Sequence, residues 1–134
     1  MFDAKEIDFN TLEAEAGDSL EEGSAMGRGF AASGGVANAV VEAVRHIAPS
    51  VPLKTAAADG LRECRKMLML AKAGKYNGYL LEGMGCPGGC VAGAGTIAPV
   101  REGAAAVERF QNQSTERSAT ASPYLNRLQQ ITEE

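Results

Sequence analysis

The stretch that decides the fold of this chain is residues 51–90, VPLKTAAADGLRECRKMLMLAKAGKYNGYLLEGMGCPGGC. Its apolar runs at 51–57 and 77–82 have the length and composition of β-strands. Between them, apolar residues recur over 61–71 at the spacing of a helix, which Gly74 ends. A strand, a helix and a second strand of these lengths predict a right-handed β-α-β unit with parallel strands.

Helices are predicted on both sides of this unit. Upstream, Ser33 can cap a helix whose apolar residues recur to Ile47. Downstream, residues 97–110 and 122–131 have helical patterns, and the polar residues 111–120 between them are expected to form an exposed connection. The expected fold class is therefore α/β: a partial lobe with a small parallel sheet, the β-α-β unit, flanked by helices and followed by a helical C-terminus.

The negative charge of the chain is concentrated near its start. Of the 17 acidic residues, eight lie within residues 1–22, where Lys5 is the single base. This stretch therefore carries a formal charge of −7 and the remaining residues carry +3, which together give the net charge of −4. We expect residues 1–29 to form an acidic extended arm, because a run of one charge is usually solvated, and residues 30–134 to form the folded part.

Composition excludes several classes of protein. The basic residues do not form a stripe interleaved with aromatics, so nucleic-acid binding finds no support. No apolar run approaches the length of about 18 residues that a membrane span needs, and the first residues lack the pattern of a signal peptide, so we expect a cytoplasmic protein. Three cysteines are too few and too odd in number for a disulfide framework, which leaves metal or thiol chemistry.

Two of the cysteines lie close together in a glycine-rich loop. Cys86 and Cys90 follow the second predicted strand, and the carboxyl ends of parallel strands are where open α/β sheets bind ligands. If Pro87 begins a helical turn, both thiols lie on one face, and the neighbouring glycines leave room for an inorganic cluster. A 4Fe-4S cluster takes four thiolates, however. Cys64 belongs to the apolar stripe of its helix and is expected to be a buried structural residue.

Two other features have simpler interpretations than a binding site. The glycines within 83–88 match the G-x-G-x-x-G pattern of dinucleotide-binding loops, but cysteine and proline occupy its variable positions, which counts against a nucleotide site. His46, in the last turn of its predicted helix, is expected to interact with the final carbonyl groups and not with a metal. The cysteine pair is therefore the candidate for metal chemistry.

Two segments resemble motifs of the iron-only (FeFe) hydrogenases. Residues 82–95, EGMGCPGGCVAGAG, are similar to the third, C-terminal cysteine motif of that family, Glu-x-Met-Ala-Cys-Pro-Gly-Gly-Cys-x-x-Gly-Gly-Gly. Residues 27–36, GRGFAASGGV, are similar to the glycine-phenylalanine segment that precedes the family's Thr-Gly-Gly-Val helix. The two segments occur in the family's order, which argues against a chance match.

The resemblance implies roles for individual residues. In the family, the first cysteine of this motif binds the 4Fe-4S cubane of the H-cluster, and the second bridges the cubane to a two-iron subcluster; these positions correspond to Cys86 and Cys90. Met84 corresponds to the methionine that lines the diiron pocket. Phe30 and Ala31 align with residues that border the diiron site, although ordinary packing at the start of a helix is an equally good interpretation of both.

The resemblance also implies that this chain is one part of a catalytic domain. The family's two other cysteine motifs, which supply the remaining cubane ligands, have no counterpart in this sequence. Residues 30–134 then correspond to the C-terminal part of the H-cluster domain, which would need the remainder of that domain or a partner subunit, and a ferredoxin-like electron donor. The complete protein is expected to be an oxidoreductase that reversibly reduces protons to hydrogen, and the chain alone to be inactive.

Departures from the family's pattern leave alternatives open. Gly85 replaces the usual alanine and Ala94 interrupts the glycine triplet, which suggests a divergent subgroup. A non-catalytic iron-sulfur or redox-sensing module related to hydrogenases would use the same two cysteines. In a purely structural α/β domain, both cysteines would be free thiols.

Overall fold

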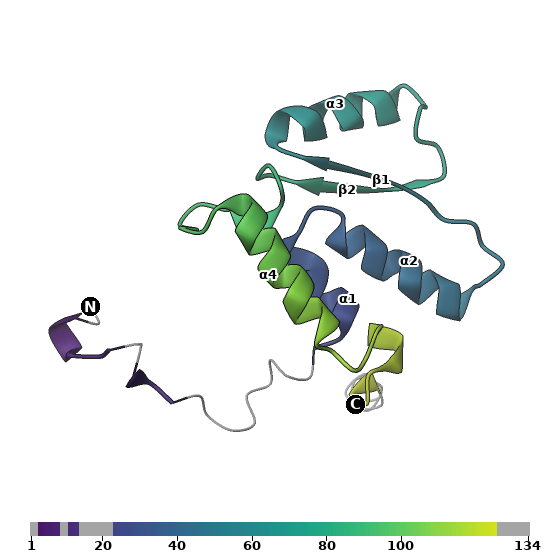
Figure 1. Cartoon of the computed structure of the whole chain (residues 1–134). Coiled ribbons are helices and arrows are strands. Elements are labelled where there is room, and N and C mark those ends of the chain that lie inside the picture. The colour runs from purple at the N-terminus through teal and green to yellow at the C-terminus, as the bar shows by residue number, and fades with distance from the viewer. Residues whose placement is uncertain (1–2, 9–10, 14–22, 126–134) are drawn as a thin grey trace, which may run out of the picture.

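The structure, a computed structural model, describes residues 3–8, 11–13 and 23–125 (Figure 1). Its helices and strands are α1 (Ala25–Arg28), α2 (Gly35–Ile47), β1 (Lys54–Asp59), α3 (Leu61–Lys72), β2 (Tyr79–Met84) and α4 (Val100–Asn112). Short 3-10 turns lie at Asp3–Lys5, Gly29–Ala31, Cys90–Ala92 and Ala119–Ala121.

The two strands are parallel, with α3 as the crossover between them, which confirms the predicted β-α-β unit. Their register pairs Asp59 with Met84 at the carboxyl ends. Both strands begin two to three residues later than the sequence patterns predict. Pro52 has no N–H for the ladder, and Gly78, at a φ of 76°, belongs to the turn that precedes β2. Because β2 starts and ends later than predicted, the strand extends to the start of the cysteine loop.

The sheet has a helix on each face: α3 covers one side and α2 lies against the other (Figure 1). Side chains alternate along β2, so the two faces take different residues. A Cβ atom at Gly83 would lie 3.3 Å from the Cys64 Sγ atom on α3, whereas the Glu82 carboxylate reaches the start of α2. The strand that leads into the cysteine loop is therefore held between two helices, and the α/β fold class is confirmed.

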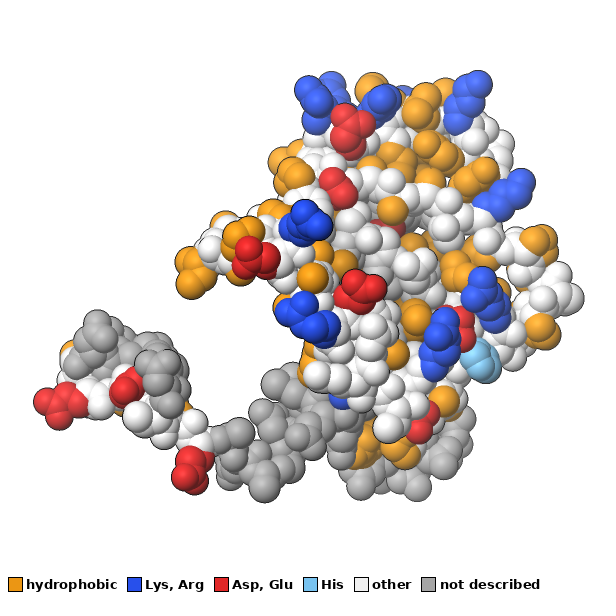
Figure 2. Space-filling model, viewed as in Figure 1, with side chains coloured by type: hydrophobic (Ala, Val, Ile, Leu, Met, Phe, Trp, Pro, Cys, Tyr) orange, Lys and Arg blue, Asp and Glu red, His pale blue; other side chains and the backbone are white. Residues whose placement is uncertain are grey.

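Little apolar surface is buried in the described part of the chain. Ala37 on α2 and Met67 on α3 are its only buried apolar side chains. The apolar stripe predicted for α2 is partly open, because Val36 and Val40 are each 37% exposed and Ile47 is 76% exposed. Apolar side chains also lie open over α3 and over the loop before α4 (Figure 2). Hydrogen bonds and ion pairs therefore hold many of the helices and strands together.

Residues 25–28 form α1, where the sequence predicts an extended arm. Ser24 caps this helix, its Oγ accepting the Gly27 N–H at 3.1 Å. The helix packs against α2 and α4 (Figure 1), and its first two N–H groups donate to the carbonyls of Glu116 and Arg117 at 2.7 and 3.0 Å. A helix of four residues is too short to show a periodic pattern, which explains why the sequence does not predict it.

The connection after α4 is exposed in part, as predicted, but it also contacts α2. Glu42 on α2 is 8% exposed, and its carboxylate accepts hydrogen bonds from Arg117 Nε at 3.2 Å and Arg45 Nη1 at 3.3 Å. Ser118, in the same connection, is 2% exposed. A polar composition indicates solvent exposure only on average, and here a guanidinium of the connection meets a buried carboxylate.

The remaining helix predictions are confirmed, corrected or lie outside the described residues. The His46 Nδ1 atom lies 2.9 Å from the Glu42 carbonyl oxygen one turn earlier in α2, and not from the final carbonyl groups of the helix as the sequence predicts. Helix α4 begins after Pro99 and not at Ile97, which is fully exposed. The helix predicted over 122–131 lies mainly outside the described residues. No helix in the described ranges has the length and apolar character needed to cross a membrane.

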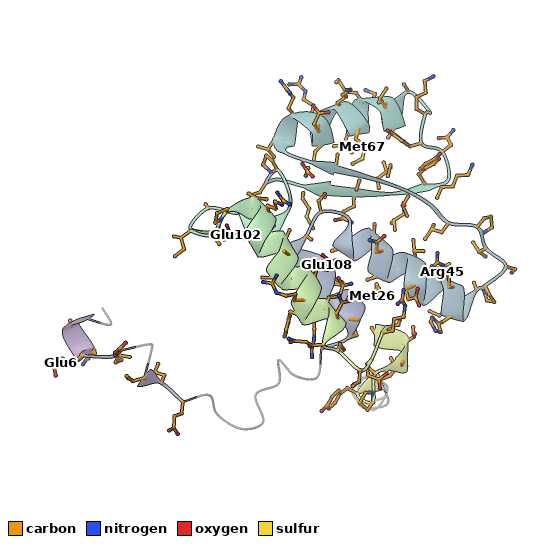
Figure 3. The ribbon with its side chains drawn as sticks, viewed as in Figure 1. Glu6, Met26, Arg45, Met67, Glu102 and Glu108 are labelled. Atoms are coloured by element: carbon orange, nitrogen blue, oxygen red, sulfur yellow. The ribbon has the colours of Figure 1, made fainter. Side chains whose placement is uncertain are left out.

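Met67 and Met69 offer a matched test of where the core lies. Both belong to α3, but Met67 is 6% exposed on the side toward the sheet (Figure 3), whereas Met69 is 57% exposed. Met67→Ala is expected to lower the free energy of unfolding by about 2 to 4 kcal/mol, because it leaves a cavity. Met69→Ala should change it by less than about 0.5 kcal/mol. Urea unfolding followed by circular dichroism measures both, and equal effects would contradict this placement of the core.

Candidate functional site

The cysteine loop is built from two consecutive turns at the end of β2. In the first, the Gly89 N–H donates to the Cys86 carbonyl at 3.0 Å, with Pro87 and Gly88 as the middle residues. Gly88 has a φ of 90°, and proline followed by such a glycine is the residue preference of a type II turn. The helical turn from Pro87 that would place both thiols on one face therefore does not form, because Gly88 has a left-handed φ and Cys90 opens a separate 3-10 turn.

This loop rests on the segment that precedes α2. The Ser33 N–H donates to the Gly88 carbonyl at 3.3 Å. A Cβ atom at Gly89 would lie 2.6 Å from the Ser33 nitrogen and 2.7 Å from the Ala31 carbonyl oxygen, so only glycine fits there. The fold thus brings the upstream glycine-phenylalanine segment into contact with the cysteine motif.

Glu82 joins the same two parts of the chain a second time. It is 9% exposed; its Oε1 accepts the Gly34 N–H at 2.9 Å, and its Oε2 accepts the Ala37 N–H at 2.7 Å. These amides lie at the start of α2, where no intrahelical acceptor exists and the helix dipole favours a carboxylate. The N-cap of α2 is Gly34 and not Ser33 as predicted, so Glu82 supplies the missing cap. Sequence reasoning missed this role of Glu82; an acidic residue at the end of an apolar strand is the signal that could have indicated such a partner.

The three cysteines differ in what their thiols contact. Cys64 is half-buried on α3, with its Sγ 3.3 Å from the Met84 carbonyl oxygen and 3.4 Å from the Ala58 carbonyl oxygen, so the thiol can donate to either. These contacts agree with the structural role expected for Cys64, but the residue is half-buried and not buried as predicted. Cys86 is half-buried and Cys90 is exposed, and neither thiol has a hydrogen-bond partner within the described ranges. These two thiols are therefore free for another ligand.

The other predicted site residues lie around the loop. Met84 ends β2 and is half-buried, and strand alternation places it on the same face as Glu82, the face toward α2. Ala31 lies against Gly89 through its carbonyl group, whereas the neighbouring Phe30 is 46% exposed. Met84 and Ala31 are therefore on the side of the loop that the upstream segment covers, and Phe30 presents much of its ring to solvent.

The residues of the loop fit part of an iron-sulfur site. The donor set is two thiols, and no group of three or more His, Cys, Asp or Glu side chains gathers in the part of the chain that the structure describes. Of the neighbouring glycines, Gly85 leaves open space, since a Cβ atom there would meet only the Leu61 side chain at 3.9 Å, whereas Gly88 and Gly89 are packed against other parts of the chain. The Gly88 N–H has no hydrogen-bond partner among the described residues. A 4Fe-4S cluster needs further ligands beyond this set.

The glycines within 83–88 do not form a dinucleotide-binding loop. Gly83 lies inside β2, and the loop leads into a 3-10 turn of three residues, whereas the dinucleotide pattern opens an α-helix. This geometry agrees with the interpretation that the glycines belong to the cysteine loop and not to a nucleotide site.

Residues 1–94 match the protein family described as iron only hydrogenase large subunit, C-terminal domain. The match covers more than half of the chain and ends just after the cysteine loop, so that α4 and the tail lie beyond it. The chain therefore belongs to this family of iron-only hydrogenase domains, as its two motifs indicate.

One similar protein is described as a probable cytosolic Fe-S cluster assembly factor from Aedes aegypti. The two proteins are 37% identical over 62 residues, which make up 46% of this chain and 13% of the relative. The chain thus spans only a small part of the length of this relative.

Gly89→Ala tests the contact between the loop and the upstream segment. The added methyl group would overlap the backbone of Ser33 and Ala31 and would stand at a φ of 97°. We expect a loss of at least about 2 kcal/mol in the free energy of unfolding, from positive-φ strain and from the overlap. Gly95→Ala is the matched control, because Gly95 has a φ of 89° with open space around it, and should lose only about 1 kcal/mol. Equal losses in urea unfolding would show that the loop does not rest on the segment.

Proposed function

We propose that this chain forms one wall of the H-cluster site of an iron-only hydrogenase. In this proposal, Cys86 binds the 4Fe-4S cubane and Cys90 bridges the cubane to the diiron subcluster. The observation that carries it is the pair of free thiols in a glycine loop that rests on the upstream segment. Membership of the hydrogenase family supports the identity of the cluster.

Neighbouring residues shape the surroundings of the cluster in this proposal. Met84 lines the diiron pocket, where a soft thioether suits a sulfur-rich group, and Phe30 and Ala31 border it. The Gly88 N–H is available to donate to a cluster sulfur, and hydrogen bonds of this kind tune the reduction potential. The Gly89 N–H is already taken by a carbonyl group of the turn, so it does not share this role.

The other wall of the site lies outside this chain in our proposal. Two further cubane ligands come from the remainder of the catalytic domain or from a partner subunit, and electrons come from a ferredoxin-like donor. Open apolar side chains support such a partner, since Leu61, Leu68 and Ile97 are 78%, 62% and 100% exposed. When bound, the H-cluster supplies the redox chemistry that interconverts protons, electrons and hydrogen. The chain's own residues hold the cluster, and the chain alone does not turn over hydrogen.

A non-catalytic iron-sulfur module is the second candidate function. The similarity to a protein described as a probable cytosolic Fe-S cluster assembly factor supports this candidate, and it also supports a cytoplasmic location. Both candidates use Cys86 and Cys90, so they differ only in the chemistry of the bound group. Hydrogen evolution from reduced methyl viologen by the complete, cluster-loaded protein would support the hydrogenase. A loaded cubane that evolves no hydrogen would support the module.

Cysteine substitutions test the proposed ligands. Anaerobic reconstitution of the full chain with iron, sulfide and excess 2-mercaptoethanol lets small thiolates fill the ligand positions that the chain lacks. We expect about four bound irons per chain, as a cubane contains. Cys86→Ser and Cys90→Ser should each lose most of this iron, because each removes one of the two protein thiolates. Cys64→Ser, the matched control, should keep it, since Cys64 hydrogen-bonds within the fold.

Iron and sulfide analysis after desalting measures these outcomes. Full iron in the Cys86→Ser and Cys90→Ser variants would contradict the proposed ligands, and so would a wild-type chain that retains no iron.

A further inference from the structure

We propose that Glu82 is a positioning residue of the cluster site, whose buried carboxylate fixes the cysteine loop against the segment before α2. The proposal is based on the two hydrogen bonds that the Gly34 and Ala37 N–H groups donate to the two oxygens of the Glu82 carboxylate. The inference rests on the proposed function for the identity of the bound group, and it adds a residue to that site.

Short stretches of backbone connect both ends of this contact to the site. On one side, Cys86 follows Glu82 by four residues, and the intervening strand is held in the parallel ladder with β1 as far as its end. On the other side, Gly34 directly follows Ser33, whose N–H donates to the Gly88 carbonyl. A movement of the carboxylate therefore shifts the cysteine loop and the upstream segment relative to each other.

Both the charge and the length of the Glu82 side chain matter to this contact. A buried carboxylate is destabilising unless it is hydrogen-bonded, and here each oxygen accepts an N–H at the positive end of the α2 dipole. Glutamine at this position would present an NH2 group to one of the two amides, which leaves a donor unpaired. Glu82→Gln therefore removes one of the two bonds while keeping the size of the side chain.

Hydrogen exchange of two adjacent amides tests the contact in the unmodified chain. Val36 and Ala37 both lie in the first turn of α2, but of their two N–H groups only that of Ala37 has an acceptor among the described residues. We expect the Ala37 amide to exchange at least about tenfold more slowly than the Val36 amide, and Glu82→Ala, which removes both acceptor oxygens, to abolish this difference. Equal exchange in the unmodified chain would overturn the proposal, whether or not any variant folds.

A soft cation tests whether the contact positions the thiols. Cd²⁺ alone serves as the probe, because thiolates bind soft metal ions and the measurement needs no assembled cluster. We expect Glu82→Gln to weaken Cd²⁺ binding about tenfold at a temperature where the variant is folded, as removal of residues that orient metal ligands does. Glu63→Gln is the matched control: Glu63 pairs with the exposed Arg62 and Lys66 on α3, and its substitution should leave the affinity unchanged.

The outcomes separate this proposal from the proposed function. If Glu82→Gln lowers the thermal stability but binds Cd²⁺ as tightly as the unmodified chain, Glu82 has a purely structural role and the proposal is wrong. If Cys86→Ser and Cys90→Ser bind Cd²⁺ as tightly as the unmodified chain, the two thiols do not form the site, and the proposed function itself fails.

Discussion

The hydrogen bonds from the start of α2 to the Glu82 carboxylate set the geometry of this molecule at its functional end. Buried apolar side chains in the described part of the chain are limited to Ala37 and Met67, so the sheet and α2 are aligned chiefly by polar contacts of defined direction. One of these contacts involves the Ala37 amide itself. Polar and apolar contacts thus meet at one residue, opposite the strand that leads into the cysteine loop.

A second buried carboxylate, Glu42, lies farther along α2 and shows by contrast why Glu82 matters. Glu42 pairs with the guanidinium groups of Arg45 (Figure 3) and Arg117. The side chains of these two arginines are 69% and 71% exposed, so solvent screens both ion pairs. Glu82 instead bonds backbone amides, which cannot move away unless the first turn of α2 unwinds. Glu42 holds the connection after α4 against α2, whereas Glu82 fixes the position of the cysteine loop near the free thiols.

Local features of this chain could be predicted from the sequence, and long-range polar contacts could not. The β-α-β unit and the position of the cysteine pair at its carboxyl end follow from patterns contained in short stretches. The type of the turn after Cys86 could not be predicted, because the positive φ of Gly88 is a backbone property that side-chain spacing does not show. The contacts of Glu82 and Glu42 join residues far apart in the sequence, so no single stretch reveals them.

Thiol footprinting before and after anaerobic cluster reconstitution is the most direct test of a site built on Cys86 and Cys90. Labelling with iodoacetamide followed by peptide mass spectrometry measures each thiol separately. Such a site predicts that Cys86 and Cys90 react readily in the cluster-free chain and become protected together on loading, while the labelling of Cys64 does not change. Protection of Cys64, or of one member of the pair without the other, would contradict it.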